Sequence, residues 1–238
     1  PSQDEPVAQG SRAVLEGYPL YVNQCARCHG LGGEGDGPGA KSPTFATVPR
    51  NLTTGHYRYV STANAIASDG DLRRVVLNGL HGSGMPAFNA LSERQVDSLV
   101  AVLNHLWKDR PAAGAAITVP PRPQSSSTVV AAGKELYSNA CVPCHGSKGY
   151  GDGPLADSIK DSNGHPVRPR NLDAGTLKGG PSATQIYYRI AAGIPAGQGN
   201  WLMPPQNGNL SPDKIWALVS YLESEVLPRG SIPEAPGK

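Results

Sequence analysis

The sequence predicts a helical chain folded into two similar domains, and three observations lead to this fold class. A Cys-x-x-Cys-His pattern occurs twice, at residues 25–29 and 141–145, with 116 positions between the two starts. The two halves align over nearly their whole length, which indicates two copies of one unit. Helix-capping signals recur at matching places, whereas an alternating strand pattern of useful length is absent.

The halves also share short segments outside the Cys-x-x-Cys-His pattern. Gly-Asp-Gly-Pro occurs in both, and so does Pro-Arg-Asn-Leu, which in the second half follows a four-residue insertion. The aligned pairs are residues 17–25 with 133–141, 35–38 with 151–154, and 49–52 with 169–172.

A middle helix is predicted in each half by a Ser N-cap, an acceptor three residues later and a terminal Gly. These residues are Ser68, Asp71 and Gly79 in the first half, and Ser182, Gln185 and Gly193 in the second.

A last helix follows in each half, with Ser92 or Ser211 as its expected N-cap and Pro212 in the first turn of the second one. Apolar residues at helical spacing give each helix one core-facing side. They are Val96, Leu99, Val100, Leu103 and Leu106 in the first half, and Ile215, Leu218, Val219 and Leu222 in the second.

We expect domains at residues 11–108 and 129–227, joined by a linker at residues 109–128. The linker is rich in Pro and Ser, a composition that is partly stiff and partly flexible. Residues 1–9 and 230–238 are expected to be poorly ordered tails.

The Cys-x-x-Cys-His pattern is typical of covalent attachment of a c-type haem, in which both thiols form thioethers and the His binds the iron. A zinc site would need a second pair of ligands nearby. Structural disulfides or a thioredoxin-like redox pair remain alternatives, although neither needs the His. The attachment residues are Cys25, Cys28 and His29, and Cys141, Cys144 and His145, so all four cysteines of the chain are used.

The chain has two methionines, Met85 and Met203, which follow the first Cys of their motifs by 60 and 62 positions. Each precedes a Pro, which favours an extended backbone. We expect them to be the second axial ligands of the two irons, and packing in the core is the alternative. The remaining histidines compete for this role, with His81 nearest to a methionine; they are His56, His81, His105 and His165.

With these motifs in place, the chain resembles a tandem dihaem c-type cytochrome, similar to two fused class I cytochrome c domains in a cytochrome c4-like arrangement. The resemblance implies an all-α fold in which N- and C-terminal helices cross over each covalently bound haem. It implies that Arg50 and Arg170 pair with haem propionates; an exposed surface role is the alternative for both. The aromatic residues it implies on the crossing helices are Tyr21, Tyr137, Trp107 and Tyr221.

Charge and hydropathy narrow the classes of partner. The formal charge of +2 becomes nearly neutral once haem propionates are counted, and no basic run suggests nucleic-acid binding. No apolar run of 18 residues is present, so no transmembrane segment is expected in this chain. The first residue is Pro1, which leaves open a removed signal peptide or anchor.

The resemblance implies an electron carrier with no catalytic residues, in the periplasm or another extracytoplasmic compartment. Its expected donor and acceptor are redox proteins: a dehydrogenase, a quinol-oxidising complex or a terminal oxidase. The alternatives are a dihaem enzyme of peroxidase or thiosulfate-oxidising type, and a soluble haem subunit of a larger oxidoreductase complex. The second half carries insertions at residues 164–166 and 197–201, so we expect two unequal potentials and a directional relay.

Overall fold

The computed structural model describes residues 9–41, 48–161, 164, 166–175, 177–180, 182–197 and 200–228. The predicted tails fall outside this part, apart from Gln9, and so does His165. The elements in chain order are α1 (Gln9–Gln24), α2 (Ala26–His29), η1 (Pro38–Lys41), α3 (Asp69–Asn78), α4 (Glu93–Leu106), α5 (Ser127–Ala140), α6 (Val142–His145), η2 (Ala156–Ser158), α7 (Ala183–Ala192), β1 (Ile194–Gly197), β2 (Asn200–Met203), α8 (Pro212–Tyr221) and the π-helical turn η3 (Leu222–Val226).

The chain divides into two compact units. The first consists of Pro1–Tyr57 and Ile66–Ala113, and the second of Arg58–Ala65 and Gly114–Lys238. The segment Arg58–Ala65 therefore lies within the first sequence repeat but belongs by its contacts to the second unit.

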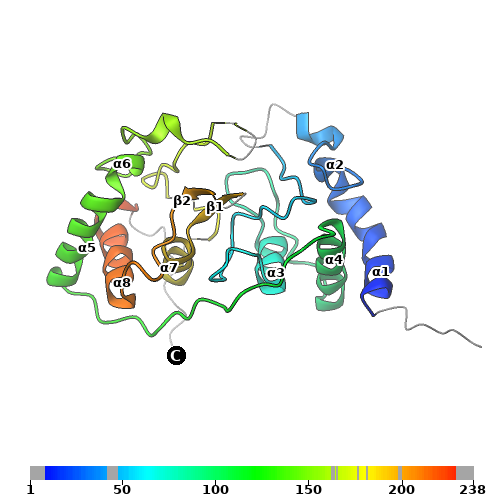
Figure 1. The fold of residues 1–238 in the computed structure, drawn as a ribbon, viewed down its shortest axis with the longest axis horizontal. Helices are drawn as coiled ribbons and strands as arrows, with labels where there is room; N and C mark the ends of the chain where they lie inside the picture. The colour runs from blue at the N-terminus through cyan, green and yellow to red at the C-terminus, as the bar shows by residue number, and fades with distance from the viewer. Residues whose placement is uncertain are drawn as a thin grey trace, which may run out of the picture. The chain divides into compact units, whose positions relative to one another are not determined.

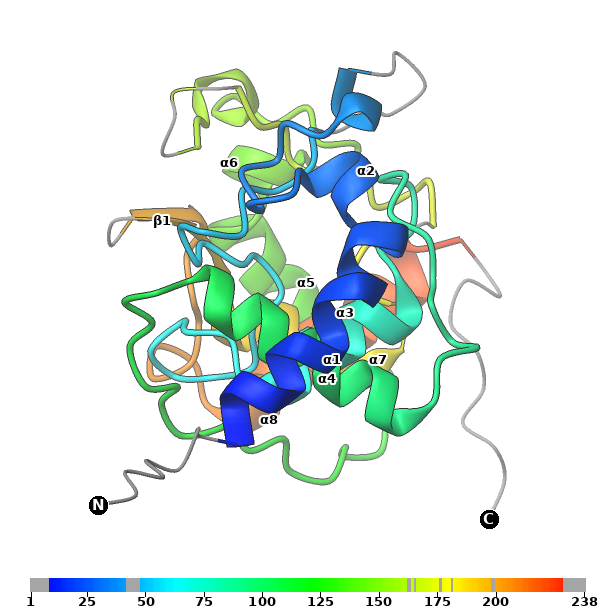
Figure 2. The ribbon, with the colours of Figure 1, turned by 90° about the vertical axis from the view of Figure 1, so that its right-hand side faces the viewer.

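In the first unit α1 packs against α4, and Figure 2 shows α1 crossing in front of it. Ser92 and Gln95 form the capping box that starts α4, as the sequence predicts for the Ser. At the crossing, a Cβ on Gly17 would overlap the backbone carbonyl of Ser98, so only glycine allows this close approach.

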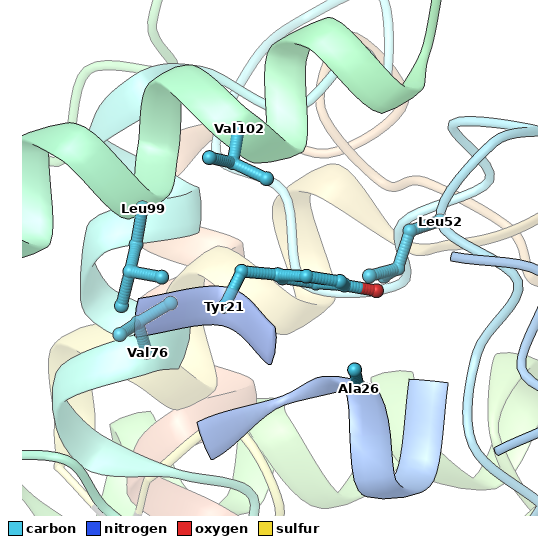
Figure 3. Close-up of a cluster of buried hydrophobic side chains, with 6 residues drawn as sticks. All are labelled: Tyr21, Ala26, Leu52, Val76, Leu99 and Val102. Atoms are coloured by element: carbon cyan, nitrogen blue, oxygen red, sulfur yellow. The ribbon is translucent and has the colours of Figure 1, made fainter. Parts of the chain in front are cut away.

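Tyr21 is the centre of the core of the first unit. Its ring is fully buried, and Figure 3 shows it between Leu99 and Val102 of α4 on one side and Ala26 on the other. Trp107 does not take the expected place on the crossing helix, because it caps the C-terminus of α4 and packs against Tyr57, 6.1 Å between ring centres.

In the second unit α5 packs against α8, and the two lie side by side in Figure 1. A Cβ on Gly133 would overlap the Ala217 carbonyl, which repeats the crossing of the first unit. Tyr137 is buried against Tyr221, with ring centres 5.3 Å apart, as the resemblance implies. Ser211 stands at the N-cap of α8, but its side chain makes no capping bond, contrary to the sequence prediction.

A two-stranded antiparallel sheet follows α7, where the sequence predicts no strand. Ile194 pairs with Met203 and Gly197 with Asn200, with irregular register between them. The corresponding contact in the first unit is a single bridge between Leu80 and Met85. Every other regular element among the described residues is a helix or helical turn, which confirms the predicted class.

Arg58–Ala65 joins the second unit through backbone pairing with the chain that follows Ala113. Thr62 bridges Ala116, and the Ile117 amide donates to the Ser61 carbonyl at 2.8 Å. Val60 and Thr62 are buried, with exposed fractions of 0% and 2%. Further along the predicted linker, the indole of Trp216 donates to the Pro120 carbonyl at 3.1 Å, so this part of the chain lies on α8.

Candidate haem sites

A single helical turn holds each set of attachment residues. In α2 the His29 amide donates to the Cys25 carbonyl at 2.9 Å, and in α6 the His145 amide donates to the Cys141 carbonyl at 2.8 Å. Residues three and four positions apart lie on one face of a helix, so both thiols and the imidazole of each motif share a face.

The cysteines are free thiols, which removes the disulfide alternative in this structure. Burial raises the pKa of Cys25 to about 11, and it does the same for Cys141. Such thiols stay protonated at neutral pH, which disfavours a reactive redox pair. Within the described part of the chain, no three His, Cys, Asp or Glu side chains gather around a metal-sized space.

The imidazole of His29 is oriented by the backbone. Its Nδ1 lies 2.9 Å from the Arg50 carbonyl oxygen, so Nδ1 carries the proton and Nε2 keeps a lone pair for iron. Burial lowers the pKa of His29, an effect that the Arg50 backbone hydrogen bond opposes. The sequence predicts a role only for the Arg50 side chain, whereas the structure also gives one to its carbonyl.

His145 differs from His29 in one respect. Burial lowers its pKa as well, and a backbone group of Arg170 opposes this effect. However, no group among the described residues meets the distance and angle of a hydrogen bond to Nδ1 of His145. The proton on this nitrogen is therefore held less firmly than the one on His29.

The Gly after each motif, and the Gly-Asp-Gly-Pro segment, shape the loop under the His. Tyr21 donates its hydroxyl to the Gly30 carbonyl at 2.8 Å, and the Gly35 amide donates to the His29 carbonyl at 2.8 Å. Gly30 has φ 80°, and a Cβ there would overlap the carboxylate of Asp36. The second unit repeats these contacts with Tyr137, Gly146, Gly151 and Asp152.

Both methionines lie on extended segments, as the following prolines predict. The Leu80 amide donates to the Met85 carbonyl at 3.0 Å, while Met203 ends strand β2. Both methionine side chains are half-buried, and neither is among the fully buried core residues.

The other candidate site residues differ in how far their side chains are exposed to solvent. Arg50 and Arg170 are half-buried, and His81 and His105 are exposed. His56 is half-buried, and its pKa is lowered by burial and by the nearby Arg50. The half-buried imidazoles, the free thiols on the same helical face and the half-buried methionines fit a covalently attached haem in each unit.

Comparison with known proteins gives the same assignment. Residues 130–225 match the family described as "Cytochrome c", and residues 12–102 match "Cytochrome C oxidase, cbb3-type, subunit III". A cbb3-type cytochrome c oxidase subunit CcoP from Azospirillum sp. (strain B510) is 29% identical over 73% of this chain and 51% of its own length. The corresponding subunit FixP from Azorhizobium caulinodans is 26% identical over 90% of this chain and 60% of its own length. The chain thus spans between half and three fifths of these curated relatives.

A solved structure shares the fold of most of the chain. It is the Kuenenia stuttgartiensis reducing HAO-like protein complex Kustc0457/Kustc0458, with a TM-score of 0.81 and 32% identity, covering 89% of this chain and 96% of that one. Within the described residues, no helix combines the length and apolar character needed to cross a bilayer. From its two cytochrome c domains and these relatives, the chain belongs to the tandem dihaem c-type cytochromes, with two covalently bound haem c groups.

Proposed function

We propose that this dihaem cytochrome carries single electrons between redox partners and has no substrate-binding metal position. The observation that supports this most directly is that each unit has one half-buried His on a single helical turn and one half-buried Met on an extended segment. An iron with both axial positions filled transfers electrons without binding a substrate.

The proposed ligand set follows residue by residue. Cys25, Cys28 and His29 attach and bind the first haem, with Met85 as its second axial ligand. Cys141, Cys144, His145 and Met203 do the same for the second haem.

Bound haem supplies the one-electron ferric–ferrous couple, and the thioether ligand raises its potential. The protein orients the imidazole through the Arg50 carbonyl and shields it from water by burial. We assign the guanidinium groups of Arg50 and Arg170 to the propionates, where a planar pair of donors matches a carboxylate.

Mass and potential measurements test this proposal. Under denaturing conditions the intact mass should exceed that of the polypeptide by two haems. Met85→His and Met203→His should each lower one potential while keeping a six-coordinate iron, because imidazole stabilises ferric iron better than a thioether does. A variant with unchanged potential and spectrum would remove that methionine from the ligand set.

The two potentials should be unequal. The second unit presents Met203 on a hairpin where the first has a single bridge, and Nδ1 of His145 lacks the bond that holds His29. Hydrogen bonding around the ligands is one of the factors that set a haem potential. A potentiometric titration in which the two haems are reduced at separate potentials would agree with a directional relay. Reduction of both haems at one potential would contradict it.

A role as a haem subunit of a larger complex is the second candidate, because the named relatives are subunits of cbb3-type oxidases. In either role we place the protein outside the cytoplasm, where the expected donors and acceptors are a dehydrogenase, a quinol-oxidising complex or a terminal oxidase. Native electrophoresis of cell extract with haem staining separates the two roles. A free carrier migrates at its own mass, and a subunit migrates with its complex.

A further inference from the structure

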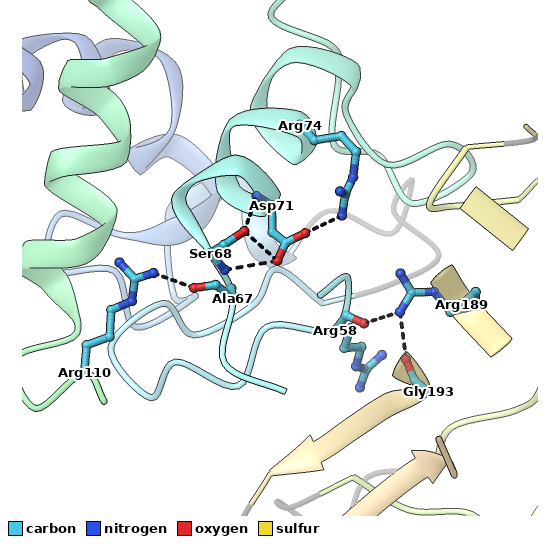
Figure 4. A network of polar contacts seen from close by, with 8 residues as sticks. All are labelled: Arg58, Ala67, Ser68, Asp71, Arg74, Arg110, Arg189 and Gly193. Atoms are coloured by element: carbon cyan, nitrogen blue, oxygen red, sulfur yellow. Dashed lines mark hydrogen bonds and ion pairs between the residues drawn. The ribbon is translucent and has the colours of Figure 1, made fainter. Parts of the chain in front are cut away.

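Arg189, in the last turn of α7, holds two distant parts of the chain together. Its Nη1 donates to the carbonyl oxygens of Gly193 at 2.9 Å and Arg58 at 2.8 Å (Figure 4). The guanidinium also lies over the ring of Tyr59, 4.7 Å from the ring centre, which is a cation–π geometry.

Gly193 leads directly into the hairpin that carries Met203. Its φ of 67° ends α7, and the next residue, Ile194, pairs with Met203. The two backbones are so close that a Cβ on Gly193 would overlap the Met203 carbonyl. A displacement of Gly193 is therefore passed to the backbone of Met203.

The segment that Arg189 contacts, at Arg58 and Tyr59, is held in place by further contacts. Tyr59 is followed by the buried Val60, and Arg58 forms an ion pair with Asp161 at 3.6 Å. Backbone pairing of Thr62 holds the same segment further along. Arg189 thus connects the hairpin to a segment that cannot easily move.

At the corresponding position of its middle helix, the first repeat has no cationic side chain. When the middle helices are aligned on their Ser caps, Val75 stands where the second repeat has Arg189. The first repeat is also longer before this helix, with 18 positions from Arg50 to Ser68 against 12 from Arg170 to Ser182. The additional length lies where the chain forms Arg58–Ala65.

We propose that Arg189 is a positioning residue for Met203, and that Arg58–Ala65 of the first repeat is part of the support of the second haem's axial ligand. This inference rests on the proposed ligation of the second iron by Met203. A thioether is a neutral and weak ligand, so the strength of its bond to iron depends on how firmly the protein holds the segment that carries it.

Loosening this support should favour ferric iron without the methionine bond and so lower the potential. Arg189→Gln should lower the potential of the second haem by about 59 mV, which corresponds to a tenfold change for a one-electron couple. The weak methionine-to-iron absorption band should decrease at the same time, while the first haem keeps its potential. Tyr59→Leu should act in the same direction to a smaller extent, and Tyr59→Phe, which keeps the ring, should act less than Tyr59→Leu.

The test is a potentiometric titration of the full-length holoprotein, followed by absorption spectra and a thermal melt. Arg122→Gln is the matched control. Arg122 also lies over an aromatic ring of the second unit, 5.6 Å from the Trp216 ring centre, and pairs with Glu223, but it contacts neither Gly193 nor the hairpin. It should lower the melting temperature without shifting either potential.

Met203→His shows which reduction wave belongs to the second haem. It also separates the proposed ligation by Met203 from the proposed positioning role of Arg189. If Met203→His shifts the wave but Arg189→Gln changes only the melting temperature, as Arg122→Gln does, the ligand set stands and the positioning role is wrong. Equal shifts of both waves in Arg189→Gln would also refute it. If Met203→His itself changes nothing, the proposed ligation fails, and this inference fails with it.

Discussion

In each unit a single tyrosine hydroxyl closes the loop that follows the His of the Cys-x-x-Cys-His motif. Tyr21 and Tyr137 are almost completely buried, and each donates to the carbonyl of the Gly that follows the motif. Burial raises the pKa of both phenols, so they stay protonated and remain donors.

Replacing this hydroxyl should cost more than replacing one at the surface. Tyr21→Phe leaves the Gly30 carbonyl without its partner, so the free energy of unfolding should fall by about 1–3 kcal/mol. Tyr18→Phe is the control, because Tyr18 is 40% exposed and its hydroxyl bonds the Leu31 carbonyl at 3.2 Å. Denaturant unfolding should separate the two variants; equal losses would mean that the buried bond has no special weight.

Tyr57 should make the first unit sensitive to alkaline pH. Burial raises its pKa to about 12 from 10, against the effect of the nearby Arg110. The folded state therefore binds more protons between these values, and the free energy of unfolding falls as the pH rises from 10 to 12. The loss from this residue should reach at most about 2 kcal/mol.

Unfolding curves across this pH range, for the parent chain and for Tyr57→Phe, measure that contribution. The parent should lose more stability than the variant. Parallel pH profiles would show that Tyr57 titrates with the same pKa in both states.

At the residue scale, the sequence predicts side-chain chemistry well and backbone chemistry poorly. The spacing of Cys25, Cys28 and His29 defines one helical face, and the structure has that face. The Arg50 carbonyl could not be found in this way, because every residue has a carbonyl and only the folded loop brings this one to His29.

Among the elements, the crossing of the first and last helix of each unit depends on glycine. Gly17 and Gly133 occupy the same place in the two repeats, and each contacts a backbone carbonyl of the opposite helix. Replacement by any other residue must push the helices apart.

Gly17→Ala should therefore destabilise the first unit by about 1–3 kcal/mol through overpacking, although alanine is the better helix former. Gly70→Ala in α3 is the control, because a Cβ there meets only the Ser68 hydroxyl at 3.6 Å, an ordinary contact. It should be neutral or raise the stability by up to about 1 kcal/mol. Thermal melts of the two variants should move in opposite directions or differ clearly in size.

Helices were easier to predict than the hairpin for a physical reason. The capping box of Ser68 and Asp71 is local in sequence, and the structure contains it. Strands β1 and β2 have four residues each, β1 contains Pro195, and the register between them is irregular. The two strands therefore lack the alternation of polar and apolar residues by which strands are detected.

For the whole molecule, the two sequence repeats and the two structural units are not the same division of the chain. The chain passes from one unit to the other after Tyr57, Ala65 and Ala113. Sequence alignment could not detect this, because Arg58–Ala65 lies where the first repeat is six positions longer than the second and because its partners are far away in sequence.

A fragment of residues 114–238 should consequently be less stable than the same residues in the intact chain. It lacks Val60 and Thr62, and losing a buried Val alone is worth about 1.5–3 kcal/mol. Hydrogen exchange of α8 amides, read by mass spectrometry, should show weaker protection in the fragment and partial recovery when a peptide of residues 57–66 is added. Identical protection in fragment and intact chain would contradict this dependence.

Arg58–Ala65 also imposes an order of events during synthesis. At about 5–20 residues per second, the 124 positions between Ala65 and Arg189 take roughly 6–25 seconds to translate. During that interval the Arg58 carbonyl lacks its donor, since Arg189 has not yet been made. The second unit is therefore complete only when its later residues reach a segment that was made long before them.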